Sequence, residues 1–357
     1  MEKKIKMKKI NLGIFFGGKS AEHEISLISA KNIIDIIDKN KYNIFPIGIN
    51  KNNEFSFYGG DHYILDSHDA KKVHLSKSGK PITFSLRNNR EFIGVLDKKL
   101  KIKLDVAFPV LHGSFGEDGT IQGIFEVAGL PYVGADVLGS VIGMNKDIAK
   151  KILEGSGIKM AKFLVFDAAN KDKINFSDIA SKLKCPFFIK PTNSGSSVGV
   201  YKIKSKNDFD KRIKNIFKLS SKIMCEEAVV GKEIECSVLG NEKPIASLPG
   251  EVISHHEFYS YEAKYLDENG AQLIIPADLS NGLIKKIQET SINVFKLLRC
   301  KGMARVDGFV NKNNDYIFNE INTIPGFTSI SMYPKLWEAS GLDPAKLIDR
   351  LIQLALE

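Results

Sequence analysis

The segment from Arg305 to Asn322 constrains the fold of this 357-residue chain more than any other stretch. Val, Ile, Phe and Tyr fill its flanks and Lys-Asn-Asn-Asp its centre, a pattern that predicts a β-hairpin. Side chains alternate across a strand with period two, so symmetric folding about the turn places one polar set on a single face. The facing pairs in this register are Asp307 with Glu320, Arg305 with Asn322, and Phe309 with Phe318.

Two carboxylates that face each other on adjacent strands repel, and a cation between them removes the repulsion. Asp307 and Glu320 stand in this relation, beside an arginine and an amide. Oxygen ligands suit Mg²⁺, which keeps several waters and binds substrate phosphates. The hairpin therefore predicts a magnesium site, and a solvated polar face with a chance carboxylate pair is the plainer alternative. The opposite, apolar face is expected to pack on a core and consists of Val306, Val310, Ile317 and Ile321.

Composition indicates an ordinary soluble globular protein, with 43% hydrophobic and 26% charged residues. The length allows two or three domains. The net charge of +9 comes from scattered basic residues without a recognition motif, so no nucleic-acid partner is expected. An anionic small substrate or a solubility effect accounts for the charge equally well. Four cysteines without C-x-x-C spacing and the lack of a long apolar stretch predict a cytoplasmic protein that does not enter the membrane.

Strand-like and helix-like patterns alternate along the chain, which favours an α/β fold. The first unit contains three apolar strands separated by a helix and by the polar, poorly periodic residues 51–100, which we expect to extend a sheet edge. A second unit begins near residue 136. The three main strands predicted in the first unit are Ile10–Phe16, Tyr42–Ile49 and Asp105–Val110, and Leu130–Val133 is predicted as a further, short strand.

Residues Gly13–Ser20 match the phosphate-binding pattern G-x-x-x-x-G-K-[ST]. The positions that should form a flexible cradle are Ile-Phe-Phe, which belong inside a strand, so we interpret the match as a decoy. The turn is then Gly17-Gly18 alone, and Glu22 follows it at the start of a helix. A carboxylate there suits an ammonium group, although an acid favoured by the helix dipole is an equal alternative.

Three loops carry further candidate chemistry. Residues Lys190–Gly199 join a strand-borne lysine to a Gly/Ser loop whose N–H groups suit phosphate, with an ordinary solvent turn as the alternative. Residues 255–275 include Lys264 and Tyr265 and predict a lid, with a surface loop as the alternative. Residues 320–331 leave the hairpin for a turn before a helix, where exposed N–H groups suit a carboxylate or an oxyanion.

Together these segments resemble the D-alanine–D-alanine ligases of the ATP-grasp superfamily, from Gly17 to about Gly341. The motifs that carry the resemblance are Gly-Gly-Lys-Ser-Ala-Glu22-His-Glu-Ile-Ser, Leu-His112-Gly-Ser-Phe-Gly-Glu-Asp-Gly-Thr, Lys190-Pro through Gly-Ser196-Ser-Val-Gly, Tyr-Glu-Ala-Lys264-Tyr265, Arg305-Val-Asp307, and Glu320-Ile-Asn322-Thr-Ile-Pro-Gly326-Phe-Thr-Ser-Ile-Ser331.

The resemblance implies an α/β, three-domain ATP-grasp fold with a Rossmann-like N-terminal domain. The expected domains are residues 1–135, which bind substrate, 136–227, with the phosphate loop, and 228–357, with the lid and the metal hairpin. It also implies ATP-dependent ligation of two D-alanines through a D-alanyl phosphate, for peptidoglycan precursor synthesis. ATP, two Mg²⁺ or Mn²⁺ ions, and a cytoplasmic homodimer are part of the same expectation.

The resemblance assigns residues to four roles. The catalytic set is Glu22, Ser196, Tyr265, Arg305 and the N–H of Gly326. The substrate-binding set is Glu22, His112, Ser331 and the N–H of Met332. The ATP-binding set is Lys146, Lys190, Ser197, Glu226, Glu227, Ala228, Val229, Glu233 and Lys264. The metal ligands are Asp307, Glu320 and Asn322.

Several alternatives stand beside this interpretation. A D-alanine–D-serine or D-alanine–D-lactate ligase shares most of the motifs, although the Tyr-Glu-Ala-Lys-Tyr segment favours D-alanine as second substrate. A P-loop phosphotransferase would require Lys19 to be essential. A non-catalytic nucleotide-binding module is disfavoured by the complete metal-ligand set. Glu227 occupies a position where many relatives have lysine, which leaves the purine contacts open.

Overall fold

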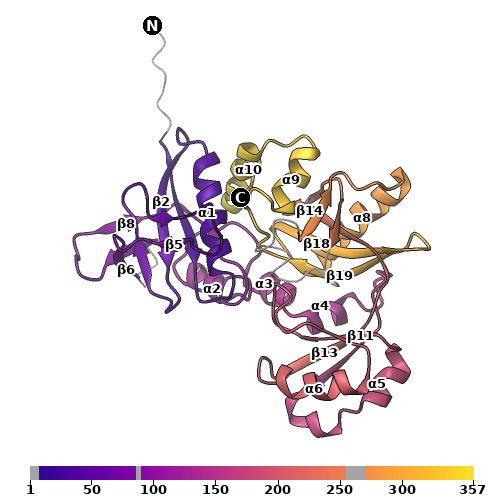
Figure 1. Cartoon of the computed structure of the whole chain (residues 1–357). Helices are drawn as coiled ribbons and strands as arrows, with labels where there is room; N and C mark the ends of the chain where they lie inside the picture. Colours follow the sequence, from indigo (N-terminus) through magenta and orange to yellow (C-terminus); the bar gives the residue numbers. More distant parts are fainter. Residues whose placement is uncertain (1–7, 86–89, 255–269) are drawn as a thin grey trace.

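Three β-sheets form the framework of the chain (Figure 1). The structure is a computed structural model, and it describes residues 8–85, 90–254 and 270–357. The N-terminal sheet, the central sheet and the C-terminal sheet follow one another in sequence, as the colour gradient in Figure 1 shows. The mixed α/β class expected from the sequence is confirmed.

The N-terminal sheet has seven strands in the order β8-β7-β6-β3-β2-β1-β9. The two pairings of β1, with β2 and β9, are parallel, and β3, β6, β7 and β8 extend one edge in antiparallel fashion, as expected for residues 51–100. The strands are β1 (Ile10–Gly17), β2 (Tyr42–Ile49), β3 (Phe55–Phe57), β6 (Lys80–Phe84), β7 (Glu91–Gly94), β8 (Lys101–Lys103) and β9 (Val106–Val110), with β4 (Ile64–Leu65) and β5 (His74–Leu75) pairing separately. The helices of this part are α1 (His23–Ile36) and α2 (Thr120–Val127).

The central sheet has four antiparallel strands in the order β10-β13-β11-β12. An apolar cluster joins it to helices α5 and α6. Its elements are β10 (Phe163–Asp167), β11 (Phe187–Pro191), β12 (Tyr201–Ile203), β13 (Lys222–Glu227), α5 (Phe176–Leu183), α6 (Lys206–Ile216) and a 3₁₀-helix (Ala168–Lys173). Helices α3 (Val137–Met144) and α4 (Lys146–Leu153) precede it in the chain.

The C-terminal sheet follows the order β17-β16-β14-β18-β19, with β15 paired to β14. Helix α8 packs against β14, β18 and β19, and α9 packs against β14. The strands are β14 (Gly231–Gly240), β15 (Ile245–Ala246), β16 (Gly250–Ser254), β17 (Ala271–Ile274), β18 (Gly302–Asn311) and β19 (Tyr316–Asn322). The helices are α8 (Asn281–Leu297), α9 (Met332–Ala339) and α10 (Pro344–Leu356).

The predicted hairpin is present as β18 and β19, and its register is confirmed at Arg305–Asn322 and Asp307–Glu320. The predicted pairing of Phe309 with Phe318 is wrong. A β-bulge follows Asp307, so Gly308 pairs with Phe318 and Phe309 with Ile317. Side chains alternate along a strand, so one unpaired residue moves every later side chain to the opposite face of the sheet. Phe318 therefore enters the core, whereas Ile317 lines a cavity instead of packing with Val306, Val310 and Ile321.

The structure confirms that the match of Gly13–Ser20 to the phosphate-binding pattern is a decoy. Gly13 to Phe16 lie inside β1 and are buried. A Cβ on Gly13 would lie 2.5 Å from a methyl carbon of Leu104, so the glycine permits close packing rather than phosphate binding.

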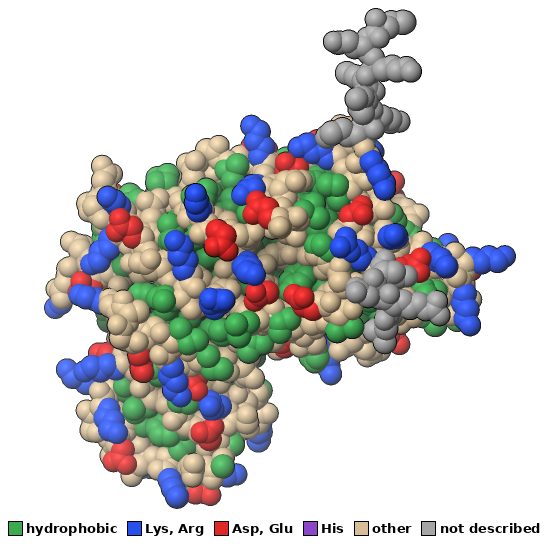
Figure 2. Space-filling model, turned by 180° about the vertical axis from the view of Figure 1, so that it is seen from behind, with side chains coloured by type: hydrophobic (Ala, Val, Ile, Leu, Met, Phe, Trp, Pro, Cys, Tyr) green, Lys and Arg blue, Asp and Glu red, His purple; other side chains and the backbone are tan. Residues whose placement is uncertain are grey.

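The C-terminal helix α10 packs into the apolar core beside the N-terminal sheet. One apolar cluster contains side chains of β1, α1 and α10, and α10 contacts both β9 and β18 (Figure 1). Lys and Arg side chains are interspersed with Asp and Glu over the face shown in Figure 2, in agreement with the scattered charge of the sequence. Among the described residues, no helix is long and apolar enough to cross a bilayer.

Candidate active site

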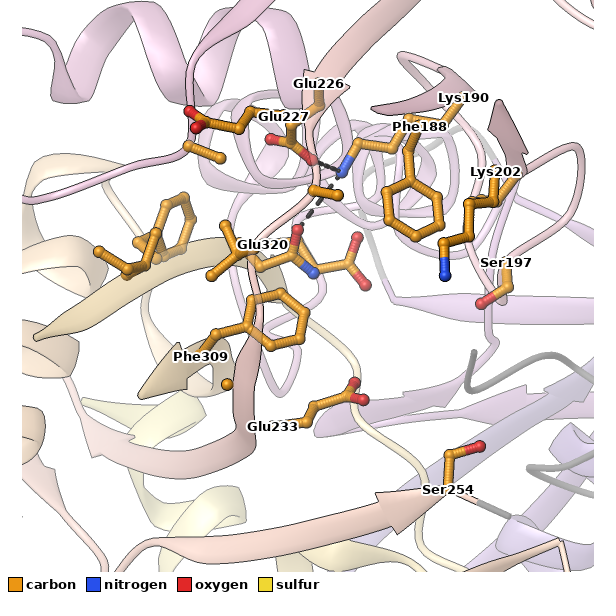
Figure 3. Close-up of a pocket in the computed structure, with 18 of the residues that line it drawn as sticks. Phe188, Lys190, Ser197, Lys202, Glu226, Glu227, Glu233, Ser254, Phe309 and Glu320 are labelled. Atoms are coloured by element: carbon orange, nitrogen blue, oxygen red, sulfur yellow. Dashed lines mark hydrogen bonds and ion pairs between the residues drawn. The ribbon is translucent and has the colours of Figure 1, made fainter. Parts of the chain in front are cut away.

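A cavity of about 550 Å³ lies between the central and C-terminal sheets (Figure 3). β11 and β13 line it from one sheet, and β14, β16, β18 and β19 line it from the other. Phe188 and Phe309 point into it from the two sheets (Figure 3). Two aromatic side chains on opposite walls offer apolar surface to a flat ring. Its lining includes most of the predicted nucleotide set, namely Lys146, Lys190, Ser197, Glu226, Glu227, Ala228, Val229 and Glu233.

The phosphate end of the cavity is formed by α4 and the Gly/Ser loop. Lys146 opens α4, and its Nζ donates to the carbonyl oxygen of Ser194 at 2.8 Å and pairs with Glu320 Oε2 at 3.1 Å. The loop turns sharply, because Ser196 and Ser197 both have φ in the left-handed region, at 49° and 58°. Successive backbone N–H groups in such a turn form a concave anion site.

Glu226 lies between two lysines at the back of the same cavity. Its Oε2 pairs with Lys190 Nζ at 2.6 Å, and its Oε1 pairs with Lys150 Nζ. Burial opposes the charge of this carboxylate, but the two lysines outweigh it, so the pKa of Glu226 is lowered. Burial lowers the pKa of Lys150, and Glu226 opposes that effect. Lys190 also donates to Asn319 Oδ1 at 3.3 Å.

The hairpin carboxylates already have cationic side-chain partners. Both oxygens of Asp307 accept from Arg305, at 2.8 and 2.7 Å, and Asn322 Nδ2 donates to Asp307 Oδ2 at 2.8 Å. Arg305 also pairs with Glu235 Oε2 at 2.8 Å. Repulsion between the facing carboxylates is therefore offset by Arg305 and, at Glu320, by Lys146. This corrects the argument that the pair by itself needs a metal ion.

The donor chemistry of the hairpin nevertheless fits Mg²⁺. Asp307, Glu320 and Asn322 are oxygen donors that share one end of β18–β19, and Glu320 faces the cavity. Within the three described stretches of chain, no three His, Cys, Asp or Glu side chains gather as a metal cluster. A metal here would thus depend on the Asn322 amide oxygen and on ligands from the substrate.

A second group of predicted residues meets beyond the Gly/Ser loop. Glu22 immediately precedes α1 and is buried. A Cβ on Gly113 would lie 2.7 Å from Glu22 Oε2, and a Cβ on Gly195 would lie 3.5 Å from it. Glycine at position 113 lets its loop approach the carboxylate closely, and the loop of Gly195 lies within ordinary contact distance of the same carboxylate. Ser196 follows Gly195, whereas Tyr265 and Lys264 lie outside the described residues.

His112 is buried with both ring nitrogens in contact with protein groups. Nδ1 lies 2.9 Å from the carbonyl oxygen of Ile324, and Nε2 lies 3.2 Å from Ser29 Oγ. A carbonyl oxygen only accepts, so Nδ1 carries the proton and Nε2 accepts from Ser29. Ser29 Oγ in turn accepts from the N–H of Phe327 at 3.2 Å. The described contacts of His112 therefore hold the turn after β19, and its predicted role in substrate binding stays a prediction.

Glu117 binds the same turn as His112, and we call these two residues together the clamp. Its Oε1 accepts from the N–H of Ile324 at 3.0 Å and its Oε2 from the N–H of Gly113 at 2.8 Å. Burial, and next the charge of Glu22, raise the pKa of Glu117 to about 8. Ile324 is thus bound through its N–H by Glu117 and through its C=O by His112.

The predicted oxyanion and carboxylate groups lie just after this clamp. Ser331 is the residue before α9, and its Oγ accepts from the N–H of Thr328 at 3.0 Å. A Cβ on Gly326 would lie 2.7 Å from Ser331 Oγ, so a larger residue there would displace the Ser331 side chain. Met332 begins α9 with a buried side chain, and its N–H is among the first of the helix, which lack intrahelical partners.

Sequence reasoning missed residues whose role depends on packing. Phe188 and Lys202 line the cavity, Lys150 and Glu235 form buried ion pairs, and Glu117 clamps Ile324. Two of them had a usable signal: Lys150 lies four residues after Lys146, on the same helix face. Glu117 lies in the same Gly-rich motif as His112.

Two sheets that enclose a lysine-lined cavity, with an acidic hairpin at its edge, define the ATP-grasp architecture. Family models described as "D-ala D-ala ligase N-terminus" and "D-ala D-ala ligase C-terminus" match residues 11–135 and 152–353. The chain therefore belongs to the D-alanine–D-alanine ligase family.

Three relatives illustrate the similarity. A D-alanine–D-alanine ligase of Oceanobacillus iheyensis is 49% identical over 353 residues, which cover 98% of this chain and 96% of the relative. The solved D-alanine–D-alanine ligase of Coxiella burnetii has a TM-score of 0.85 and 38% identity, covering 98% and 94% of the two chains. A solved D-Ala:D-Ser ligase of Enterococcus faecalis has a TM-score of 0.85 and 36% identity, covering 98% and 100%.

Proposed function

We propose that the chain joins two D-alanines into D-alanyl-D-alanine at the expense of ATP, for cell-wall synthesis. The observation that carries this function is the cavity between the two sheets, where Lys146 and Lys190 face the Glu320 end of the hairpin. The cavity lies in a chain that belongs to this ligase family along nearly its whole length.

ATP would occupy the 550 Å³ cavity. We place its purine between Phe188 and Phe309, against residues 226–229, and its ribose near Glu233. Its phosphates would meet Lys146, Lys190 and Ser197, and Lys264 is the further lysine that the resemblance assigns to them. Asp307, Glu320 and Asn322 would hold two Mg²⁺ or Mn²⁺ ions, which neutralise phosphate charge when bound.

Residues at the substrate end of the cleft would bind the two D-alanines and stabilise their reaction. Glu22 holds the ammonium group of the first D-alanine, whose carboxylate oxygen attacks the γ-phosphorus of ATP as ADP leaves. The amine of the second D-alanine, after losing a proton, attacks the acyl carbon, and phosphate leaves. Arg305 and the N–H of Gly326 stabilise the tetrahedral oxyanion.

The remaining groups would position the reactants. Ser331 and the N–H of Met332 bind the carboxylate of the second substrate. Ser196 and Tyr265 would form a hydrogen-bonded triad with Glu22. The domain boundaries at residues 135 and 227, the cytoplasmic location and the homodimer belong to the same proposal.

A product assay tests this function directly. Purified protein is incubated with ATP, Mg²⁺ and equal concentrations of D-alanine, D-serine and D-lactate, and the products are separated by mass. We expect D-alanyl-D-alanine as the main product with stoichiometric ADP. The structural likeness to a D-Ala:D-Ser ligase keeps D-alanyl-D-serine as the second candidate. A dominant mixed product, or no ADP formation, would contradict the proposal.

A further inference from the structure

One buried carboxylate is shared by two buried lysines behind the nucleotide cavity. Glu226, near the end of β13, pairs through one oxygen with Lys150 and through the other with Lys190 at 2.6 Å. The exposed fractions of the three side chains are 7%, 1% and 8%. Three ionised groups in such a place interact strongly, because little water screens them.

The two lysines face different surroundings. Lys190 lines the cavity, and its Nζ also contacts Asn319. Lys150 is not among the residues that line the cavity, and its Nζ lies against two aromatic rings. Its Nζ is 5.7 Å from the ring centroid of Phe163 and 5.9 Å from that of Phe318. Lys150 therefore has no path to a nucleotide in this arrangement, although Lys146, one turn earlier on α4, lines the cavity.

The net charge of the group formed by Lys150, Glu226 and Lys190 indicates what Lys150 contributes. With Lys150, Lys190 and Glu226 ionised, the group carries one net positive charge. Without Lys150, Glu226 would cancel the charge of Lys190, and an incoming phosphate would meet a neutral pair. Asn319, the other partner of Lys190, carries no charge to replace the loss. A nearby cation that holds the carboxylate prevents this competition.

We infer that Lys150 is a positioning residue for the nucleotide: it neutralises Glu226 so that the charge of Lys190 remains available to phosphate. This inference rests on the proposed function, in which Lys190 contacts the phosphates of ATP. Lys150 itself touches neither ATP nor an amino-acid substrate.

The test compares removal of the buried cation with its replacement by another cation. Lys150→Met keeps an apolar stem of similar length and removes the cation. We expect the KM for ATP and the Kd for ADP to rise about tenfold, the scale of one charged contact, with kcat at saturating ATP within about threefold. Lys150→Arg keeps a cation against Glu226, so nucleotide affinity should stay within about threefold of wild type.

Lys151→Met is the matched control. Lys151 is adjacent on α4 but exposed, and it pairs with Asp147 at 2.8 Å. Its loss should leave the KM for ATP unchanged. A merely structural role for Lys150 would lower thermal stability without a selective loss of nucleotide affinity in Lys150→Met and its retention in Lys150→Arg.

The outcomes separate this inference from the proposed function. Unchanged ATP affinity in Lys150→Met, or a folded Lys150→Arg that binds ATP about tenfold more weakly, overturns the inference. Lys150→Arg decides the matter if Lys150→Met does not fold. Lys190→Met tests the site itself. If Lys190→Met binds ATP normally, the ATP site is misplaced and the proposed function of this cavity fails as well.

Discussion

The two ends of the cleft are held together by different kinds of contact. At the nucleotide end, the acidic hairpin is local in sequence: Asp307 and Glu320 face each other across one turn, and Arg305 and Asn322 hold Asp307. At the substrate end, the turn after β19 is fixed from far away. His112 and Glu117 reach Ile324 across 212 and 207 residues of sequence.

This difference teaches which contacts a short motif can encode. Strand register places the hairpin groups once the two strands pair, so they need few outside contacts. The turn at residues 324–327 carries neighbours of the oxyanion group, yet its geometry depends on the N-terminal sheet. We therefore expect changes in the hairpin to affect charge, and changes in the clamp to affect position.

The largest effect should come from Glu320→Gln. The change removes a carboxylate from the proposed metal site and takes the ion-pair partner from Lys146. We expect kcat/KM to fall about a hundredfold or more, the scale of losing a preorganised electrostatic contact. Steady-state kinetics over a Mg²⁺ titration measures it. Glu289→Gln, an exposed change on α8, is the control, and near-normal activity in Glu320→Gln would remove the hairpin from the mechanism.

Glu117→Gln should come next, and it should act through position. A glutamine places an NH₂ group against one of the two backbone N–H groups that now donate to the carboxyl oxygens of Glu117. We expect kcat to fall about tenfold to a hundredfold, because a small displacement of reacting groups is costly. ATP affinity should stay within about twofold, as measured by calorimetry. Glu126→Gln on the exposed side of α2 is the control, and a loss of ATP affinity equal to the loss of kcat would contradict a clamp.

The pH dependence of stability should distinguish the clamp further. Glu117 has a folded pKa raised to about 8 from 4.5, so the folded state keeps a proton that the unfolded state releases. Its contribution to stability is present below pH 4.5 and is lost as the pH rises toward 8. Glu117→Gln should flatten the fall in unfolding free energy between pH 5 and 8 in urea titrations. Equal slopes for both proteins would show that Glu117 stays ionised throughout.

The smallest effect should come from Ser29→Ala. The variant loses the hydroxyl that joins His112 Nε2 to the N–H of Phe327. We expect a loss of about 1 kcal/mol of unfolding free energy, as for one buried hydrogen bond, and a change in kcat below about threefold. Thermal unfolding measures the first and kinetics the second. Ser78→Ala, in an exposed turn, is the control; no change in either quantity would mean that His112 holds the turn without Ser29.

Elements with strong local patterns were predicted closely. The bounds of β2 agree with the structure, and those of β1 and β9 agree to within one residue. The predicted register of the hairpin is wrong only beyond Asp307, because a β-bulge adds one residue to a strand without altering its composition. The short strands β3 to β8 had no readable bounds, because two to five residues give too little periodicity.

The candidate site divides in the same way. Lys146, Lys190, Glu226 and Glu320 lie together around one cavity, in agreement with the roles that the family resemblance implied. Phe188 was not predicted, since a lone aromatic gives no local sign of what it faces. Lys150 was not predicted either, since its spacing from Lys146 gives a helix face but not its pairing with Glu226. His112 was assigned to substrate, whereas its described contacts are with Ile324 and Ser29.

The sequence by itself determined the local parts: the paired carboxylates, the lysine before the Gly/Ser loop, the helix that begins after Glu22, and the family to which they belong. These depend on alternation, glycine and capping, which act over a few residues. Only the tertiary structure decided that Glu226 lies between two lysines and that residues 112–117 clamp Ile324. Buried charges and backbone groups find their partners on the segments that packing brings together. The residues next to them in sequence do not determine which segments those are.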